Sequence, residues 1–194
     1  RWGRRSLLTR GVTVEEQDDL ARALAYRHFI ETIRPAVKIF EDQLNKKYLA
    51  EQMRWKPDPR RYDVYTRALR TDMELFREEN VVLETEVDLR TQEYQTITGA
   101  MTVVFEGKER TLPEMGKFLH EPDRDLRERA WKSAARRRLD DKDSLEQLFD
   151  RLISLRIKIA ENAGFSNFCD YKFRALHRFD YTPQDCKQYH ASIE

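Results

Sequence analysis

Apolar residues recur every three or four positions along most of this chain of 194 residues. That spacing places them on one face of an α-helix and leaves the other face polar. Pro35 interrupts the first repeat and is expected to kink or restart its helix, because proline lacks a backbone N–H and clashes with the preceding turn. The pattern therefore predicts a mainly α fold, a multi-helix bundle or array, with the repeat in residues 20–33, 37–48, 62–76, 83–94 and 145–159.

One stretch departs from the helical pattern and reads MTVVFEGKERTLPEM, residues 101–115. Its apolar and polar residues alternate around a glycine, which is the period of a strand on each side of a turn. We therefore expect one short β-hairpin near 101–112, with Val103 and Phe105 facing helices, since a hairpin alone is marginally stable. The chain is expected to form a single helical region, 1–194, with a softer sub-boundary near 99–113.

Capping residues predict where several helices begin. Thr13–Glu16 and Thr111–Glu114 have the spacing of a capping box, and Thr182 precedes a first-turn proline and an acid at the third position. Asp123 and Ser166 are expected to cap two further helices. Gly99 and Gly164 are well placed to end the helices before them.

The last predicted helix begins after Thr182, and the sequence stops at Glu194. A helix that has run only one or two turns, without a C-terminal cap, is an unusual end for a natural protein. We therefore expect the chain to be the front part of a longer protein.

Charge is high but balanced, with 36 basic and 35 acidic side chains and a net charge of +1. Such balance gives no general field that attracts nucleic acid or anionic lipid. The most basic segment, Arg136–Arg138, is interleaved with acids, and Glu128 and Lys132 have the spacing of a solvated helical ion pair. No apolar run approaches the ~20 residues that span a bilayer. We therefore expect neither a nucleic-acid nor a membrane partner.

The two cysteines, Cys169 and Cys186, lack CxxC spacing and the density of a secreted disulfide scaffold. We interpret them as idle or buried thiols in a reducing cytoplasm. This interpretation predicts a cytoplasmic location.

Histidine gives no metal motif in this sequence. His120–Glu121 begins like HExxH, but Arg124 stands where the second histidine is needed and Pro122 interrupts the turn. His28 and Glu31 supply at most two ligands, and a catalytic zinc takes three. Dinucleotide, P-loop and nucleophile-elbow motifs are also absent from the sequence. No complete active site is therefore predicted in this chain.

Four stretches together resemble oligoendopeptidase F and its relatives, the thimet-oligopeptidase-like zinc metallopeptidases. They match in order and spacing the region that precedes the catalytic part of those enzymes. The stretches are EYQTITGAMTVVFEGKERTLPEMGKFL (93–119), EPDRDLRERAWKSA (121–134), LRIKIAENAGFSNFCDY (155–171) and RFDYTPQDC (178–186).

The resemblance implies an almost entirely helical enzyme whose two halves surround a deep channel that admits short peptides. Its C-terminal half would carry HExxH and a later glutamate, and its zinc would activate water for peptide hydrolysis. This chain would be the N-terminal half, a channel wall or lid that is inactive alone. Its implied partners are the C-terminal catalytic half and short peptide substrates. Because the motif is absent here, no catalytic or metal residue is assigned and no zinc is expected on this chain.

Four residues near the last predicted helix are candidates for contact with substrate in the channel: Tyr171, Arg178, Asp180 and Tyr181. A guanidinium can bind a peptide carbonyl or C-terminus, and a phenol can donate or accept a hydrogen bond. The alternative, which we favour, is structural. Arg178 would then pair with Asp180, and Tyr181 would pack across the joint between two helices.

Two other functions remain open from the sequence. One is a stand-alone helical module that binds a protein partner without catalysis, and the weaker one is a nucleic-acid module that uses Arg136–Arg138. As half of a peptidase, the isolated chain would expose apolar surface that the catalytic half covers, so self-association is also expected.

Overall fold

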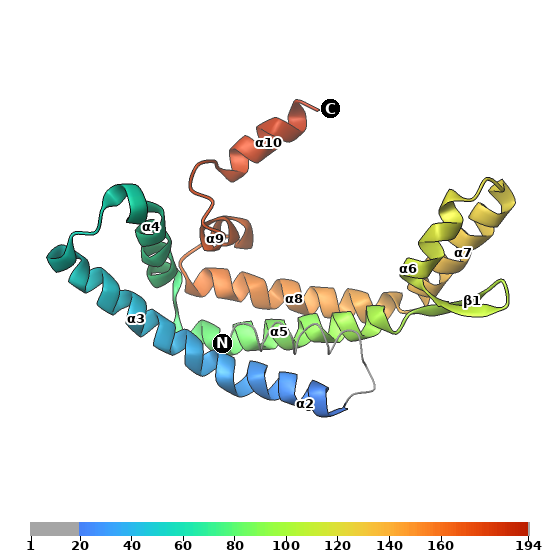
Figure 1. The fold of residues 1–194 in the computed structure, drawn as a ribbon, viewed down its shortest axis with the longest axis horizontal. Coiled ribbons are helices and arrows are strands. Elements are labelled where there is room, and N and C mark those ends of the chain that lie inside the picture. Colours follow the sequence, from blue (N-terminus) through green and yellow to red (C-terminus); the bar gives the residue numbers. More distant parts are fainter. Residues whose placement is uncertain (1–19, 194) are drawn as a thin grey trace. The chain divides into compact units, whose positions relative to one another are not determined.

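The computed structural model describes residues 20–193 (Figure 1). The predicted fold class is confirmed, because the described chain is mainly helical and contains one two-stranded antiparallel sheet. The capping box predicted at Thr13–Glu16 lies outside the described residues. In chain order the elements are α2 (Leu20–His28), the π-helical turn η1 (Phe29–Ile33), α3 (Arg34–Trp55), α4 (Pro59–Leu75), α5 (Glu78–Gly99), β1 (Thr102–Phe105), β2 (Lys108–Thr111), α6 (Leu112–Met115), the 3-10 turn η2 (Gly116–His120), α7 (Arg124–Asp140), α8 (Lys142–Asn162), α9 (Phe168–Ala175) and α10 (Pro183–Ala191).

These residues fall into two compact units, each described here by itself. Unit 1 contains residues 20–28 and 88–152, and unit 2 contains residues 29–87 and 153–193. Helices α5 and α8 therefore contribute residues to both units. The single region 1–194 with a sub-boundary near 99–113 stays a prediction.

The hairpin in unit 1 has the predicted position and orientation. Strands β1 and β2 pair in antiparallel register, Thr102 with Thr111 and Phe105 with Lys108. The turn residues Glu106 and Gly107 both have positive φ, which suits a tight hairpin turn and which glycine adopts without strain. Because alternate side chains point to opposite faces, Val103 and Phe105 are buried whereas Val104 is 76% exposed.

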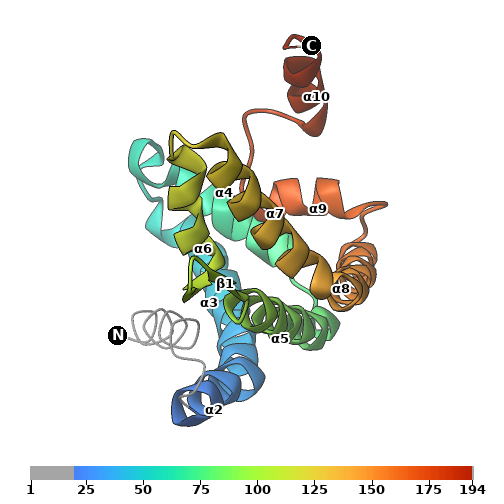
Figure 2. The same ribbon diagram turned by 90° about the vertical axis from the view of Figure 1, so that its right-hand side faces the viewer.

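Helices α6 and α7 lie beside this hairpin in both views (Figure 1, Figure 2). The buried core of unit 1 contains Val103, Phe105, Met115 and Ala130. The Phe105 and Phe118 rings meet edge to face, with 4.9 Å between their centroids. The hairpin thus gains its stability by packing against helices, as expected for two strands that cannot bury a core alone.

The predicted caps at Thr111, Asp123 and Thr182 are confirmed. Thr111 and Thr182 each accept a hydrogen bond from the third backbone N–H of their helix, and Glu114 and Asp185 accept bonds in return. These backbone and hydroxyl donors hold the pKa of both carboxyl groups below its usual value. The cap predicted at Ser166 is wrong by one residue, because Asn167 accepts the bond from the Asp170 N–H.

Pro35 restarts the helix, as predicted. The five residues of η1 have π-helical bonding, and α3 begins at Arg34 with the proline in its first turn. A widened turn at this place relieves the clash between the proline ring and the carbonyl four residues earlier. The Lys56–Asp58 segment is an irregular loop, and Asp58 caps α4 by accepting from the Arg60 N–H at 3.0 Å.

Two parts of the predicted apolar pattern are exposed. Val37, Phe40 and Leu44 share one face of α3, as their spacing predicts, yet each is between 41% and 59% exposed. Phe149 was expected in the inward stripe of α8, but it is exposed while Leu148 and Leu152 are buried. Periodicity shows which residues share a face, but it does not show what covers that face.

The core of unit 2 joins segments that are distant in sequence. Leu75, Ile159, Ala160, Ala163 and Tyr171 form its buried cluster. Beside this cluster, the buried side-chain amide of Asn80 donates to the Ile159 carbonyl at 3.0 Å and accepts from Asn162 Nδ2 at 2.7 Å. The amide therefore ties α5 to α8 within the unit, with both polar ends paired.

No helix in the described part of the chain is both long and apolar enough to cross a membrane.

Candidate functional site

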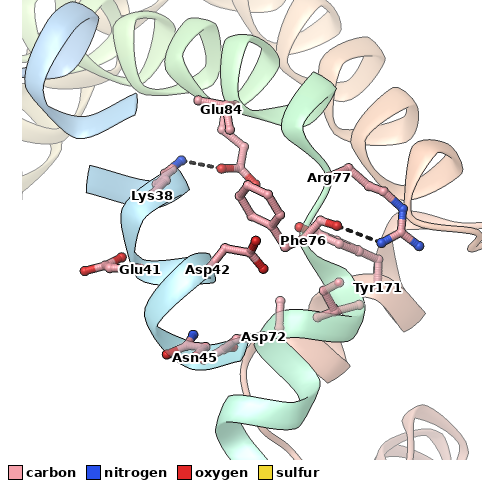
Figure 3. A pocket seen from close by; sticks show the side chains of 12 residues that line it. Lys38, Glu41, Asp42, Asn45, Asp72, Phe76, Arg77, Glu84 and Tyr171 are labelled. Atoms are coloured by element: carbon pink, nitrogen blue, oxygen red, sulfur yellow. Dashed lines mark hydrogen bonds and ion pairs between the residues drawn. The ribbon is translucent and has the colours of Figure 1, made fainter. Parts of the chain in front are cut away.

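Unit 2 contains a cavity of about 250 Å³ that α3, α4, α5, α9 and the α4–α5 link enclose (Figure 3). We call it the α3–α4 cavity. One wall is apolar and the other carries carboxylates and two basic groups. The lining residues are Lys38, Glu41, Asp42, Asn45, Asp72, Leu75, Phe76, Arg77, Val81, Glu84, Tyr171 and Ala175.

Asp42 is the most unusual polar residue of the cavity. It is only 6% exposed, and its Oδ2 lies 2.6 Å from Lys46 Nζ one helical turn away. Its other oxygen, Oδ1, is buried and has no hydrogen-bond partner among the described residues. Figure 3 shows this carboxylate directed into the cavity, whereas the neighbouring Glu41 points away from it. A buried carboxylate oxygen without a donor is costly, so this atom is poised to accept a hydrogen bond.

The remaining charges of the cavity are partly compensated. Lys38 of α3 forms an ion pair with Glu84 of α5. The Arg77 guanidinium donates to the backbone carbonyls of Glu74, Phe76 and Asn162, at 2.9, 2.7 and 3.1 Å. Arg77 thereby secures the link between α4 and α5 without neutralising a carboxylate.

Tyr171 forms part of the floor of the cavity and is the only predicted candidate that lines it. The residue is buried, and its ring contacts Phe165 and Phe168 with centroids 5.7 and 5.8 Å apart. Burial, together with the nearby negative charge of Glu84, raises the pKa of Tyr171 to about 12. The phenol is therefore neutral at physiological pH, where it can both donate and accept a hydrogen bond.

This raised pKa predicts an alkaline loss of stability. Unfolding returns Tyr171 to its ordinary pKa of 10.0, so its neutral form favours the folded state. The contribution is complete below pH 10 and is lost as the pH rises towards 12. We expect one of the 8 tyrosines to ionise near pH 12 in an absorbance titration at 295 nm, and Tyr171→Phe to remove that step. If Tyr171→Phe removes a step near pH 10 instead, the hydroxyl is not held in the buried position described here.

Asp72 and His177 form a polar pair at another side of the cavity. His177 Nε2 lies 2.6 Å from Asp72 Oδ1, and its ring stacks on Phe179 with centroids 5.7 Å apart. His177 has a positive φ of 54°, directly after the end of α9. Nothing in the local sequence indicated this pairing of His177 with α4.

Three predicted candidates lie in the link between α9 and α10 and do not line the cavity. The favoured interpretation paired Arg178 with Asp180, and this pairing is wrong. Asp180 Oδ1 accepts from Arg67 Nη2 at 3.2 Å, and the Arg67 guanidinium lies 4.0 Å from the Phe179 ring centroid. An arginine of α4 thus holds the link in place.

Arg178 and Tyr181 instead form an exposed cluster with Phe173. The Arg178 guanidinium lies 4.9 Å from the Phe173 centroid and 5.9 Å from that of Tyr181. The two rings meet edge to face at 5.7 Å, which agrees with the expected packing of Tyr181 across the joint.

The sequence reading missed Asp42, Glu84 and Asp72. Asp42 and Lys46 have the i, i+4 spacing of an ordinary surface pair, which is also what Glu128 and Lys132 form in α7. No local signal separates the two cases, because burial of Asp42 depends on contacts with α4.

The predicted compensation of Arg136–Arg138 is visible at Arg137, which pairs with Asp141 at 2.5 Å. The two cysteines are free, and Cys169 is exposed rather than buried.

Zinc is the metal that the sequence resemblance implies. Among residues 20–193, no three histidine, cysteine, aspartate or glutamate side chains are grouped to hold a metal ion. The sequence also has no HExxH. The residues that the structure describes therefore do not fit a catalytic zinc, which takes three protein ligands, and no catalytic step is derived through one.

Comparison with known proteins gives the fold. No protein-family model and no curated protein matches the chain. Among solved structures, PZ peptidase A with an inhibitor is 22% identical with a TM-score of 0.84, and an oligoendopeptidase F is 24% identical with a TM-score of 0.85. An oligoendopeptidase F from Bacillus anthracis str. Ames is 20% identical with a TM-score of 0.84.

Each likeness covers 91% of this chain but only 31–32% of the other. The chain thus spans about a third of the length of these structures. At the level of fold, the resemblance to oligoendopeptidase F is confirmed: this chain is folded like one part of those peptidases.

Proposed function

We propose that the chain is the non-catalytic N-terminal portion of a zinc-dependent oligopeptidase of the oligoendopeptidase F type. In the whole enzyme it forms one wall or lid of the channel that receives short peptides. The C-terminal half supplies the HExxH motif, the zinc and the hydrolysis of the peptide bond. The chain alone is inactive, and the whole enzyme is cytoplasmic.

One observation carries this proposal. Nearly all of the chain, 91%, superposes on about a third of each peptidase at TM-scores of 0.84–0.85. A match of that extent is what a part of such an enzyme would give. The absence of HExxH from the sequence supports the assignment to the part that carries no metal.

Within this function, Tyr171, Arg178, Asp180 and Tyr181 are proposed to face the substrate channel. The exposed cluster of Arg178 and Tyr181 offers a guanidinium and a phenol to a peptide backbone. The exposed face formed by Val37, Phe40 and Leu44 is proposed as surface that the catalytic half covers, and it is the source of the expected self-association.

The complete reading frame tests this proposal without any assay. We expect an HExxH motif within the few hundred residues after Glu194, followed by a glutamate on a later helix. A complete reading frame without HExxH would overturn the peptidase assignment and leave the stand-alone protein-binding module as the better reading.

The isolated chain gives a second test. We expect no zinc by elemental analysis and no cleavage of a quenched fluorescent oligopeptide, because the sequence has no HExxH and residues 20–193 group no three metal-ligating side chains. Zinc bound at one equivalent per chain would contradict the assignment of the metal to the other half.

A further inference from the structure

The α3–α4 cavity combines three features that together indicate which chemical class of ligand it would bind. It holds a buried carboxylate oxygen without a donor, an aromatic ring, and an apolar wall. Asp42 Oδ1 is the unpartnered acceptor, and the side chain that carries it is 6% exposed. Phe76 supplies the ring, and Leu75, Val81 and Ala175 supply the apolar wall.

We propose that this cavity binds a primary ammonium group of a short peptide, either the α-amino group of its N-terminus or the side chain of a lysine. An ammonium group carries three N–H donors and a compact positive charge. Asp42 Oδ1 accepts one hydrogen bond, and the Tyr171 hydroxyl is a second acceptor in the same lining. That the ligand is a peptide rests on the proposed function, whereas the preference for ammonium rests on the cavity alone.

The formal charges that face the cavity are nearly balanced. Glu41 points away from the cavity, so three lining carboxylates, those of Asp42, Asp72 and Glu84, accompany two lining cations, Lys38 and Arg77. Lys46 adds a third cation through its pair with Asp42, and His177 pairs with Asp72. The Arg77 guanidinium donates to backbone carbonyls, but it keeps its positive charge in the lining. Three carboxylates thus meet three cations, and the preference for an ammonium group comes from Asp42 Oδ1, which can accept a hydrogen bond that an anion without N–H or O–H groups cannot donate.

The Phe76 ring adds a second attraction for a cation. Lys46 Nζ already lies 5.8 Å from the Phe76 centroid, within the range of a cation–π contact. The ring in Figure 3 stands beside the Asp42 carboxylate and the Glu84 carboxylate, so both attractions act on the same space. A metal ion is the poorer candidate, since no three suitable ligands are grouped among the described residues.

Three small ligands test whether the cavity prefers an ammonium group and whether that group is a peptide N-terminus or a lysine side chain. Their binding is measured by isothermal titration calorimetry or NMR chemical-shift perturbation. They are trialanine with a free N-terminus, N-acetyl-trialanine amide, and N-acetyl-lysine amide. We expect trialanine or N-acetyl-lysine amide to bind at least about tenfold more tightly than N-acetyl-trialanine amide, because only the first two carry an ammonium group. Tight binding of trialanine alone identifies the peptide N-terminus, and tight binding of N-acetyl-lysine amide alone identifies lysine.

Three variants separate recognition by Asp42 from a structural role. Asp42→Asn should weaken binding of the preferred ligand at least about tenfold, whereas Lys46→Gln should strengthen it several-fold by leaving the carboxylate unopposed. If Asp42 served only its pair with Lys46, the two variants would act in the same direction. Glu51→Gln is the matched control, because it removes an exposed ion pair of α3, with Arg54, that lies outside the cavity. This variant should bind the preferred ligand as tightly as the unmodified chain does.

Several results would overturn this inference: equal binding of the free and acetylated tripeptides, no binding of either ammonium ligand, or unchanged binding by Asp42→Asn. If circular dichroism shows that Asp42→Asn does not fold, the comparison of the three ligands and the effect of Lys46→Gln still test the inference. Equal binding of free and acetylated peptides would leave the proposed function intact, whereas a reading frame without HExxH would overturn that function whatever the cavity binds.

Discussion

Replacing Phe105 with alanine is expected to lower the free energy of unfolding by about 3–5 kcal/mol, the usual cost of removing a buried aromatic side chain. Phe105 is 7% exposed, and it packs against the Phe118 ring and the buried Met115. A hairpin of two strands has no other core, so the loss should unfold unit 1 locally before the remainder. Urea denaturation followed by circular dichroism measures the change.

Neighbouring valines on the same strand provide the matched control for Phe105→Ala. Val103 is 9% exposed and Val104 is 76% exposed, although the same substitution to alanine can be made at both. We expect Val103→Ala to lower the free energy of unfolding by about 1–3 kcal/mol and Val104→Ala to lower it by less than about 0.5 kcal/mol. Equal losses at the two positions would show that the hairpin does not present this face to α6 and α7.

Asn80→Ala is expected to lower the free energy of unfolding by about 1–3 kcal/mol, because it removes a buried amide together with both of its hydrogen bonds. The Asn80 amide is 2% exposed and bonds both the Ile159 carbonyl and the Asn162 amide. Alanine would leave the Ile159 carbonyl with only its bond from the Ala163 N–H and the Asn162 amide without Asn80, beside a small cavity. The change in unfolding free energy is again measured by urea denaturation.

Asn162→Ala is the control for the Asn80 network. It keeps the bond from Asn80 to the Ile159 carbonyl and removes only the bond between the two side chains, which is partly buried. We expect Asn162→Ala to lower the free energy of unfolding by about 1 kcal/mol. A cost for Asn80→Ala no greater than that of Asn162→Ala would mean that the bond to Ile159 contributes nothing to joining α5 and α8.

Local patterns predicted the elements well, because their causes lie within a few residues. The alternation of Val103, Val104 and Phe105 identified the buried face of the hairpin. The threonines at 111 and 182 identified two capping boxes, each closed within one helical turn. Pro35 predicted the restart of a helix through the N–H that it lacks.

Contacts between distant segments were not predictable from one sequence. Arg67 and Asp180 are 113 residues apart, and nothing near Asp180 identified α4 as the source of its partner; Arg178, two residues away, was the natural guess. The candidate site shows the same limit. Tyr171 was found because the resemblance drew attention to its segment, but Asp42 resembles any acid that has a lysine one turn away.

The central claim is that this chain works as part of an oligopeptidase, and hydrolysis by the product of the complete reading frame tests it most directly. The measurement is cleavage of a quenched fluorescent oligopeptide before and after treatment with a zinc chelator, with a folded protein as the second substrate. We predict cleavage of the peptide, its loss on chelation, its return with added zinc, and no cleavage of the folded protein. A complete product that leaves the peptide intact in the presence of zinc would contradict the claim.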